Sequence, residues 1–390
     1  MKINYSKQFI DRNDINFVTQ SLKAEMITQG SYINKFETAL KSYFKAKYCS
    51  AVSNGTAALY LACRSLGWGK NDTIITSPIT FVATANAIEA VGAKTELVDI
   101  EENTYCLDLN KLEYKIKKLK KQKKKIKGII AIDYAGQPSR WKEINFLRKK
   151  YKLQIINDNC HALGASYNGS KGYAVKYADI VCQSYHPVKN FTTGEGGSVL
   201  SNNKIIIDKI NKLRSHGIER NKKNLIIKKN FSNWYYEAQD LSFNFRISDI
   251  NCALGISQLK KLDSFVKFRK KIAKIYNKEL TNLECVFTPK NITNSSHSYH
   301  LYPIRIDFKK LNINKRKLFN YFLKKNYKLQ VHYIPIYMHP YYKKKYNYKL
   351  KDFPVSNKFY EQIVSIPNFY GFSKSKQYEF IELFKNYVSK

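Results

Sequence analysis

The sequence predicts an α/β fold: a mainly parallel sheet flanked by helices, followed by a smaller C-terminal α+β domain. Apolar runs of strand length alternate with helical patterns over the first two-thirds of the chain. Those runs are apolar on both faces, which is typical of a parallel sheet covered on both sides. One long helical stretch then leads into a region that mixes strands and helices.

The individual elements follow in order along the chain. The strand-like runs cover 48–53, 71–77, 95–100, 126–134, 153–158, 178–184 and 196–202. The helical patterns between them cover 55–67, 81–92 and 139–151. The stretch 248–280 has no sheet-like alternation and suits a helix that connects two domains. Strands at 298–306 and 328–336 and helices at 315–325 and 374–388 complete the chain. We therefore predict a large domain over 1–247, including an N-terminal arm, and a linking helix with a small domain over 248–390.

Composition limits the class of protein. The chain has 390 residues, 44% of them hydrophobic and 14% aromatic, which suits a globular protein. The polar N-terminus lacks the apolar core of a signal peptide, and no apolar run reaches the roughly 20 residues that span a bilayer. We expect a soluble cytoplasmic protein without a membrane partner. Seven scattered cysteines without CxxC spacing are expected to be buried free thiols, with no metal site.

The net charge of +38 raises the alternative of a basic nucleic-acid-binding or regulatory protein. The basic residues are spread along the chain, and Lys, Asn, Ile and Tyr are abundant together, as an AT-rich coding bias would produce. The densest block, 115–127, reads as a solvated helix or loop face leading into a strand. We expect no nucleic-acid partner, although a positive field would attract a phosphorylated small substrate.

Polar residues follow several of the predicted strands, where ligands bind in such sheets. In "SNGTAALYL" (53–61), Gly55 permits a tight turn and a helix opens at Thr56 and Ala57, which suits a phosphate; an ordinary N-cap is the alternative. In "IINDNCHALGA" (155–165), Asp158 could hold a cationic ring nitrogen, with His161 three residues on. A helix-capping carboxylate and a structural histidine are the alternative there.

Two further segments complete the candidate site. Ser184 ends an apolar strand, and Lys189 follows five residues later, before a glycine-rich turn. A lysine partly removed from water has a lowered pKa and can attack an aldehyde. A surface lysine on a glycine loop is the alternative. Asn244 and Arg246 precede the long helix, where they could serve the site or simply the helix entry.

Five motifs in order, "VSNGTAAL", "SPITFVATANAI", "NDNCHALGA", "SYHPVKNFTTGEGG" and "FNFRISDINCALGISQL", resemble the DegT/DnrJ/EryC1/StrS family of sugar aminotransferases. The resemblance runs from the N-terminal arm to "IPNFYGFSKSKQYEFI" and so covers essentially the whole chain. It implies the aspartate aminotransferase fold (fold type I), pyridoxal 5′-phosphate (PLP) as cofactor and a homodimer with shared active sites.

The resemblance also implies roles for particular residues. Lys189 would bind PLP as a Schiff base, Asp158 would pair with the pyridine nitrogen, and both would be catalytic. His161 would hydrogen-bond the ring hydroxyl, and Phe81 would stack on the ring. The phosphate would be bound by Thr56, Ala57, Ser184 and, from the other subunit, Asn244, with Arg246 as a competitor for that role or a substrate contact. The sugar site would be lined by His186, His332 and Tyr333.

The motifs "SYHPVKNFTTGEGG", "WYYEAQDLSFNFRISD" and "VHYIPIYMHPYY" are most similar to one branch of the family. That branch transfers an amino group from glutamate to C4 of a UDP-linked 4-keto-6-deoxy-N-acetylhexosamine in pseudaminic acid biosynthesis. Another 3- or 4-keto nucleotide sugar is the alternative substrate. Asn157, Asn159 and Cys160 stand where the family commonly has an acidic and then small residues. Some relatives replace the Schiff-base lysine by histidine and dehydrate sugars, so Lys189 favours transamination.

Overall fold

A seven-stranded sheet forms the centre of the protein, in a computed structural model that describes residues 2–227 and 232–389. Its strand order is β2-β9-β8-β6-β5-β3-β4. The bounds are β2 Tyr48–Val52, β3 Asp72–Thr76, β4 Lys94–Leu97, β5 Lys125–Ile132, β6 Gln154–Asp158, β8 Ile180–Ser184 and β9 Gly197–Ser201. Only β9 runs antiparallel to its neighbours, so the mainly parallel sheet is confirmed.

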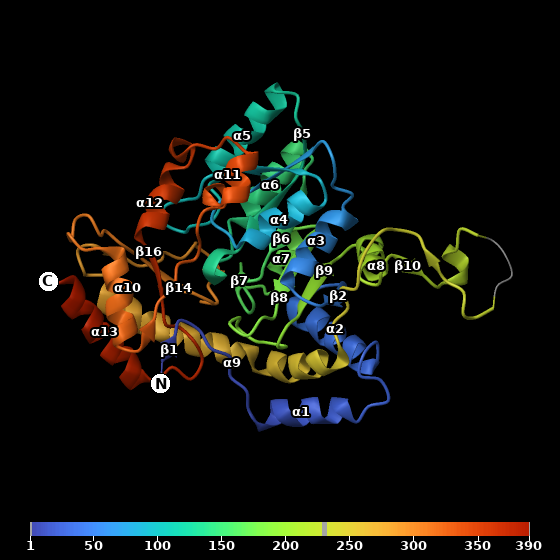
Figure 1. Ribbon diagram of the computed structural model, residues 1–390, viewed down its shortest axis with the longest axis horizontal. Helices are drawn as coiled ribbons and strands as arrows, with labels where there is room; N and C mark the ends of the chain where they lie inside the picture. The colour runs from blue at the N-terminus through green and yellow to red at the C-terminus, as the bar shows by residue number, and fades with distance from the viewer. Residues whose placement is uncertain (1, 228–231, 390) are drawn as a thin grey trace.

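Helices cover both faces of the sheet, as Figure 1 shows. Ile129, Ile155 and Val181 point to one face, and their neighbours Ile130, Ile156 and Cys182 point to the other. The first face packs against α2 Ser31–Phe44, α5 Leu109–Lys121, α6 Trp141–Tyr151 and α7 Tyr173–Tyr177. The second face packs against α3 Gly55–Ser65, α4 Val82–Ala90 and α8 Lys204–Leu213. The lysine-rich block 115–127 contributes the end of α5 and the start of β5, as expected.

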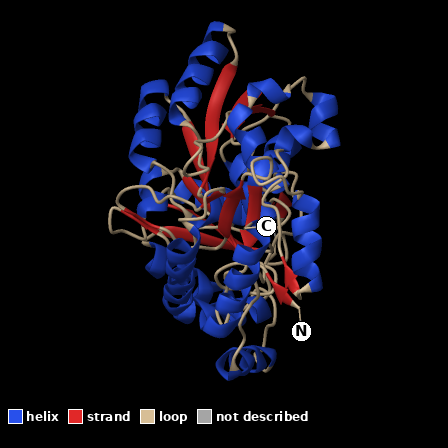
Figure 2. Ribbon diagram, turned by 90° about the vertical axis from the view of Figure 1, so that its left-hand side faces the viewer, coloured by secondary structure: helices blue, strands red, loops and turns tan. Residues whose placement is uncertain are grey.

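The long helix α9 (Asp249–Leu280) links the sheet to a second core, as its sequence predicts. The Ser248 hydroxyl caps it by accepting a hydrogen bond from the Asn251 N–H at 3.2 Å. Its last turns pack in the C-terminal core, which is separate from the apolar layers of the sheet. The C-terminal elements are β12 Val286–Phe287, β14 Tyr302–Ile306, β16 Ile363–Ile366, α10 Lys315–Lys324, α11 Pro340–Lys345, α12 Pro354–Gln362 and α13 Lys374–Val388. Figure 2 shows the strands enclosed by helices in the perpendicular view.

The N-terminal arm crosses to the C-terminal core. Strand β1 (Ile3–Asn4) pairs in parallel with β15 (Tyr327–Lys328). Helix α1 (Arg12–Leu22) then lies along α9, on the outside of the molecule (Figure 1). The boundary between the two domains at 247/248 stays a prediction. None of the helices in the described ranges is both long and apolar enough to cross a bilayer.

The expected strand over 328–336 is wrong. Only β15 and a single bridge from Gln330 to Ser365 are extended pairs, and Ile336–Met338 form a 3-10 turn. Pro335 has no N–H with which to continue a ladder. The His332 Nδ1 lies 2.9 Å from the Ser365 hydroxyl, and the Tyr333 hydroxyl lies 2.9 Å from the His161 Nε2. The alternating apolar residues of this segment therefore pack their side chains without forming a regular strand.

A short hairpin of β10 (Ile218–Glu219) and β11 (Glu237–Ala238) leads into a segment that projects from the body beside α8 (Figure 1). Trp234, between these two strands, is 71% exposed, and Leu241 at 77% and Phe243 at 58% follow shortly after β11. A surface of this kind is typical of a contact with another chain.

Candidate active site

The N-terminus of α3 lies directly against the end of β8. A Cβ on Gly55 would lie only 2.7 Å from the Ser184 Cβ, so the close approach requires glycine. Asn54 caps the helix by accepting the Ala57 N–H at 2.8 Å. That N–H is therefore engaged, and no described residue accepts from the N–H of Gly55 or Thr56. Two free N–H groups at a helix N-terminus, beside the Ser184 hydroxyl, are the kind of donors that suit an anion.

Asp158 ends β6 and is 6% exposed. Its Oδ2 accepts a hydrogen bond from the Thr84 hydroxyl at 2.7 Å, and its Oδ1 accepts the Cys160 N–H at 3.3 Å. Thr84 in turn lies 2.8 Å from the Thr80 hydroxyl. Both carboxylate oxygens are held by donors, which fixes the carboxylate in one orientation and suits its ionised form. Such a carboxylate can hold a protonated ring nitrogen.

Lys189 closes a turn in which its N–H donates to the His186 carbonyl at 2.8 Å. The side chain is half-buried, and no described residue forms a hydrogen bond or ion pair with its Nζ. Burial lowers the pKa of Lys189, while the nearby Cys160 and Asp158 oppose that shift. An amine with a lowered pKa and no fixed partner can act as a nucleophile toward an aldehyde.

His161 is buried and contacts Tyr333. Its Nδ1 accepts the Ala135 N–H at 3.2 Å, and its Nε2 lies 2.9 Å from the Tyr333 hydroxyl. Burial lowers the pKa of His161 well below its usual value, and Lys189 and His332 add to the effect. The neutral ring therefore carries its proton on Nε2 and donates to the Tyr333 oxygen. The Tyr333 proton is left free for another acceptor.

The remaining residues predicted around the cofactor and sugar lie in different settings. Phe81 precedes α4 with its ring 56% exposed and 5.9 Å from the Tyr333 ring, so one face is open to a planar ligand. His332 is buried, and its Nδ1 lies 2.9 Å from the Ser365 hydroxyl. Burial and, to a smaller extent, the charge of Lys189 lower the pKa of His332 to about 3. His186 is exposed at the surface of the Lys189 turn.

Arg246, two residues after Asn244, lines a separate cavity. The Asn244 Oδ1 accepts the Arg246 N–H at 3.2 Å. Arg246 lines a cavity of about 190 Å³ together with Gln29, Gly30, Ile33, Asn34, Ala51, Arg214, Ser215 and Ile247. Lys189, Asp158 and Ser184 do not line it. Among the described residues, no hydrogen bond or ion pair joins the side chain of Asn244 or Arg246 to the other predicted site residues, although Arg246 pairs with Val52 in an isolated bridge close to the start of α3.

Three contacts of the site were missed in the sequence. The Thr84 hydroxyl donates to Asp158. The sequence feature that could have indicated this contact is the position of Thr84 one turn after Phe81 in the motif "TFVAT". The buried His300 ring lies 4.6 Å from the His161 ring, and nothing in its local pattern indicates this contact. Ser6 in the N-terminal arm donates to the Val188 carbonyl at 2.9 Å, so the arm touches the Lys189 turn.

Comparison with known proteins identifies the family. The profile of the DegT/DnrJ/EryC1/StrS aminotransferase family matches residues 8–385. The chain belongs to this family. It is 41% identical over 366 residues to the UDP-4-amino-4,6-dideoxy-N-acetyl-beta-L-altrosamine transaminase of Campylobacter jejuni, covering 94% of this chain and 92% of that protein.

Solved structures of family members have the same fold. PseC of Helicobacter pylori, an aminotransferase involved in pseudoaminic acid biosynthesis, superposes with a TM-score of 0.89, 28% identity and full coverage of both chains. The PLP form of a Streptococcus pneumoniae protein assigned as a sugar aminotransferase gives a TM-score of 0.86 at 25% identity, covering 100% and 99% of the two chains. The predicted fold type I and the family resemblance are confirmed, and the protein is an aminotransferase.

Aminotransferases of this family use PLP, and the residues of this chain fit that cofactor. PLP presents an aldehyde, a pyridine nitrogen, a flat ring and a phosphate. The chain offers an unpaired amine at Lys189 and an oriented carboxylate at Asp158. It also offers an open aromatic ring at Phe81 and free N–H groups beside Ser184 at the start of α3.

Proposed function

We propose that the protein transfers an amino group from glutamate to C4 of a UDP-linked 4-keto-6-deoxy-N-acetylhexosamine, as in pseudaminic acid-type nucleotide-sugar biosynthesis. The observation that carries the proposal is the unpaired, half-buried amine of Lys189 with a lowered pKa, close enough to Asp158 for their charges to interact. The choice of substrate is supported by the 41% identity to the Campylobacter jejuni transaminase and by the fold shared with PseC.

Different residues would bind different parts of the cofactor. PLP, when bound, supplies an electron sink that stabilises negative charge on the carbon bearing the amino group. Asp158 would keep the pyridine nitrogen protonated, with Thr84 holding the carboxylate in place. The N–H groups of Gly55 and Thr56 and the Ser184 hydroxyl would bind the phosphate. Ala57 would shape this helix end, since its own N–H is engaged by Asn54.

Lys189 would carry the proton transfers. Its Nζ would hold the cofactor covalently between turnovers. Once released by the amino donor, the neutral amine would take a proton from the carbon of the donor that bears the amino group. In the second half of the reaction it would give a proton to the sugar carbon that receives the amino group. The lowered pKa of Lys189 makes the neutral form available at lower pH than in a solvated lysine. Tyr333, whose oxygen accepts from His161, would direct its own proton to an oxygen of the cofactor or sugar.

A second copy of the chain would complete the site. Leu241 and Phe243, which are exposed, lie within three residues of Asn244, and exposed Trp234 lies ten residues before it. The cavity that Arg246 lines does not include Lys189. A homodimer that buries this face would let Asn244 or Arg246 reach the phosphate or the nucleotide of the partner site. This arrangement predicts complementation: mixing and exchanging subunits of Lys189→Ala and Asn244→Ala, each poorly active, should restore activity. Absence of recovery in verified mixed dimers would argue against shared sites.

A substrate panel tests the proposed reaction. The purified protein with PLP and glutamate should aminate a UDP-4-keto-6-deoxy-N-acetylhexosamine at C4, with the product configuration read by NMR. Turnover of only 3-keto sugars, or of only 4-keto sugars linked to another nucleotide, would replace the substrate but keep the enzyme class. The alternative of a basic nucleic-acid-binding or regulatory protein predicts that glutamate fails to convert bound PLP to its amino form.

A further inference from the structure

A continuous network of buried polar side chains runs across several strands on one face of the sheet. The side chain of Asp158 lies on the other face. The members of the network are 0–2% exposed: Asp133, Asn157, Asn159, Tyr173, Gln183, Tyr185 and Ser198. They belong to the ends of β5, β6, β8 and β9 and to α7. Buried polar groups are costly unless hydrogen-bonded, so a network of this size calls for a physical account. The proposed mechanism uses none of these side chains.

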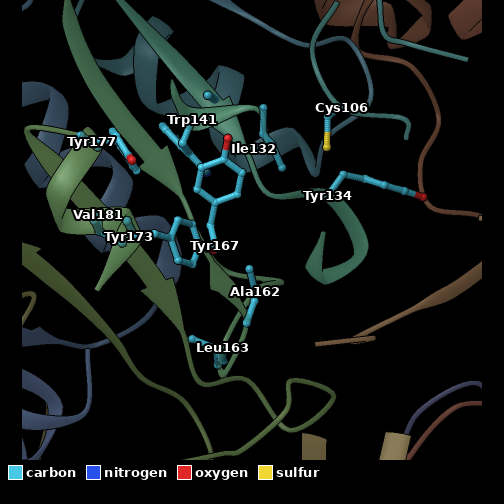
Figure 3. Packing of buried hydrophobic residues seen from close by; sticks show 14 of the residues in the cluster. Cys106, Ile132, Tyr134, Trp141, Ala162, Leu163, Tyr167, Tyr173, Tyr177 and Val181 are labelled. Carbon is cyan, nitrogen blue, oxygen red and sulfur yellow. The ribbon is translucent and has the colours of Figure 1, made fainter. Parts of the chain in front are cut away.

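Asp133 is the acceptor at one end of this network. Its Oδ1 accepts the Ser139 N–H at 2.8 Å and the Trp141 Nε1–H at 2.9 Å. Its Oδ2 accepts from Asn157 at 3.1 Å, Asn159 at 2.9 Å and the Tyr173 hydroxyl at 2.7 Å. Trp141 and Tyr173 lie in the aromatic layer that Figure 3 shows. Burial raises the pKa of Asp133, and these hydrogen bonds oppose the rise. Four of the five donors are N–H groups that accept nothing, so the cage fits a carboxylate.

The orientation of each amide in the network follows from this carboxylate. Asn159 must present its Nδ2 to Asp133, which leaves its Oδ1 to accept from Gln183 Nε2 at 3.2 Å. Gln183 then presents its Oε1, which accepts from the Tyr185 hydroxyl at 2.9 Å. The Ser198 hydroxyl lies 2.6 Å from that phenol and completes the network. Each hydrogen bond is therefore donated in the direction from β9 toward β5. This direction is set by Asp133, whose carboxylate can only accept.

The network joins the two loops that carry the proposed cofactor residues. Asn159 directly follows Asp158, and the Asp133 N–H donates to the Asp158 carbonyl at 3.1 Å. Tyr185 directly follows Ser184, and its carbonyl accepts from the Thr193 N–H at 3.1 Å and the Thr192 hydroxyl at 2.8 Å, at the base of the Lys189 turn. Two of the three residues that depart from the usual family pattern, Asn157 and Asn159, are donors to Asp133.

We infer that Asp133 is a positioning residue: by setting the direction of these hydrogen bonds, it fixes Asp158 relative to Ser184 and Lys189. The inference rests on the PLP site proposed above. A site of this kind works only when its residues are held by a supporting layer, and side chains locked by hydrogen bonds provide one. Asp133 touches neither cofactor nor substrate in this account and acts through Asn159, Gln183 and Tyr185.

Asp133→Asn tests the inference with readouts other than activity. The new amide would place an NH₂ group against one of the donors that now share the carboxylate. Asp133 would then no longer fix which side chain donates and which accepts along the network. The Kd for PLP should rise at least about tenfold, because the loss of hydrogen bonds to a buried charge would let Asp158 shift relative to Ser184 and Lys189. The visible circular dichroism of bound PLP, which reports how the ring is held, should change. Tyr185→Phe removes only the far hydroxyl and should give a smaller change in the same direction.

Two matched variants separate positioning from general stability. Asp99 is also buried, at 3% exposure, and accepts from Ile100, Val355, Ser356 and Lys111, but it fastens α12. Asp99→Asn should lower the Tm without changing the PLP Kd or the circular dichroism. The swap Asp133→Asn/Asn159→Asp keeps one carboxylate in the network. Asn157, whose Oδ1 has no described partner, can turn to accept from the new amide. The swap should recover part of the affinity and the original dichroism sign.

The outcomes are distinct. A lower Tm for Asp133→Asn with an unchanged PLP Kd and dichroism would contradict the positioning role. A swap variant no better than Asp133→Asn would contradict the argument from hydrogen-bond direction. If the wild-type chain itself does not bind PLP, the proposed site fails, and the inference fails with it for that separate reason.

Discussion

Replacing Gly55 by alanine perturbs the proposed phosphate site at its closest contact. The added Cβ would lie 2.7 Å from the Ser184 Cβ and 3.2 Å from its Oγ. Carbon atoms in contact normally stay about 3.5–4.0 Å apart, so α3 and β8 must separate by roughly 1 Å. The shift would displace the free N–H groups of Gly55 and Thr56 from the Ser184 hydroxyl.

Two opposing terms set the size of the effect on stability. Overpacking of this kind costs about 1–3 kcal/mol. Alanine regains up to about 1 kcal/mol over glycine in a helix, and less at its first position. We expect the free energy of unfolding to fall by about 1–2 kcal/mol. The separation should also raise the PLP Kd about tenfold, since 1.4 kcal/mol corresponds to a factor of ten.

Gly69→Ala is the matched control. A Cβ there would find nothing closer than the Val91 carbonyl oxygen at 3.6 Å, an ordinary contact. Its stability should change by less than about 0.5 kcal/mol and its PLP Kd not at all. Urea unfolding of the apoprotein and absorbance titration with PLP measure the two quantities. A destabilised Gly55→Ala protein with an unchanged Kd would refute the phosphate site at α3, and unchanged stability would refute the packing argument.

Three further changes test the other parts of the site. Asp158→Asn should still bind PLP but lower kcat by about 10²–10³-fold, because a neutral amide no longer favours the protonated ring nitrogen; an unchanged kcat would exclude this role. Phe81→Ala should alter the free energy of unfolding by less than about 0.5 kcal/mol, since the ring is 56% exposed, yet raise the PLP Kd several-fold; equal affinities would speak against ring stacking. The rate at which the apoprotein combines with PLP should rise with pH and reach half its maximum below pH 10.5. Only the neutral amine reacts, and burial lowers the pKa of Lys189 from that value. A midpoint at or above pH 10.5 in stopped-flow titrations would contradict the desolvated amine.

Much of the sheet and of the site could be predicted because both depend on local patterns. Strands apolar on both faces mark a covered parallel sheet, and polar residues at their carboxyl ends gather at one edge. This reasoning places Asp158 and Ser184 at the ends of β6 and β8, where the structure has them. The bounds of the long helix α9 are predicted to within a residue, since Ser248 provides a cap and no proline occurs in the 32 residues of the helix.

The rest depends on partners that are distant in the sequence. Asp133 follows an apolar strand and Gln183 lies within one, but the side chains that bond them come from 24 to 40 residues away: Asn157, Asn159 and Tyr173 donate to Asp133, and Asn159 accepts from Gln183. His300 meets His161 only because the C-terminal part folds back onto the sheet. The engaged N–H of Ala57 is a local exception, because it follows from Asn54 acting as an ordinary N-cap. Arg246 lines a cavity apart from Lys189, and the role proposed for it and Asn244 needs a second chain.

The same limit explains the error at 328–336. The segment has strand-like alternation, but it makes only the bridge from Gln330 to Ser365 beyond β15, and Pro335 lacks an N–H to continue the pairing. The side chains of His332 and Tyr333 bond Ser365 on β16 and His161. Pattern alone cannot distinguish a side chain that packs in a sheet from one that reaches a site. The mistaken strand is thus part of the proposed sugar pocket.

The central claim is that Lys189 holds the cofactor. Reduction of the PLP-loaded protein with borohydride, followed by proteolysis and mass spectrometry, fixes the point of attachment. The account predicts a pyridoxyl phosphate adduct on the peptide that contains Lys189, and none on that peptide in Lys189→Ala. An adduct confined to another lysine, or a Lys189→Ala protein with full aminotransferase activity, would contradict it.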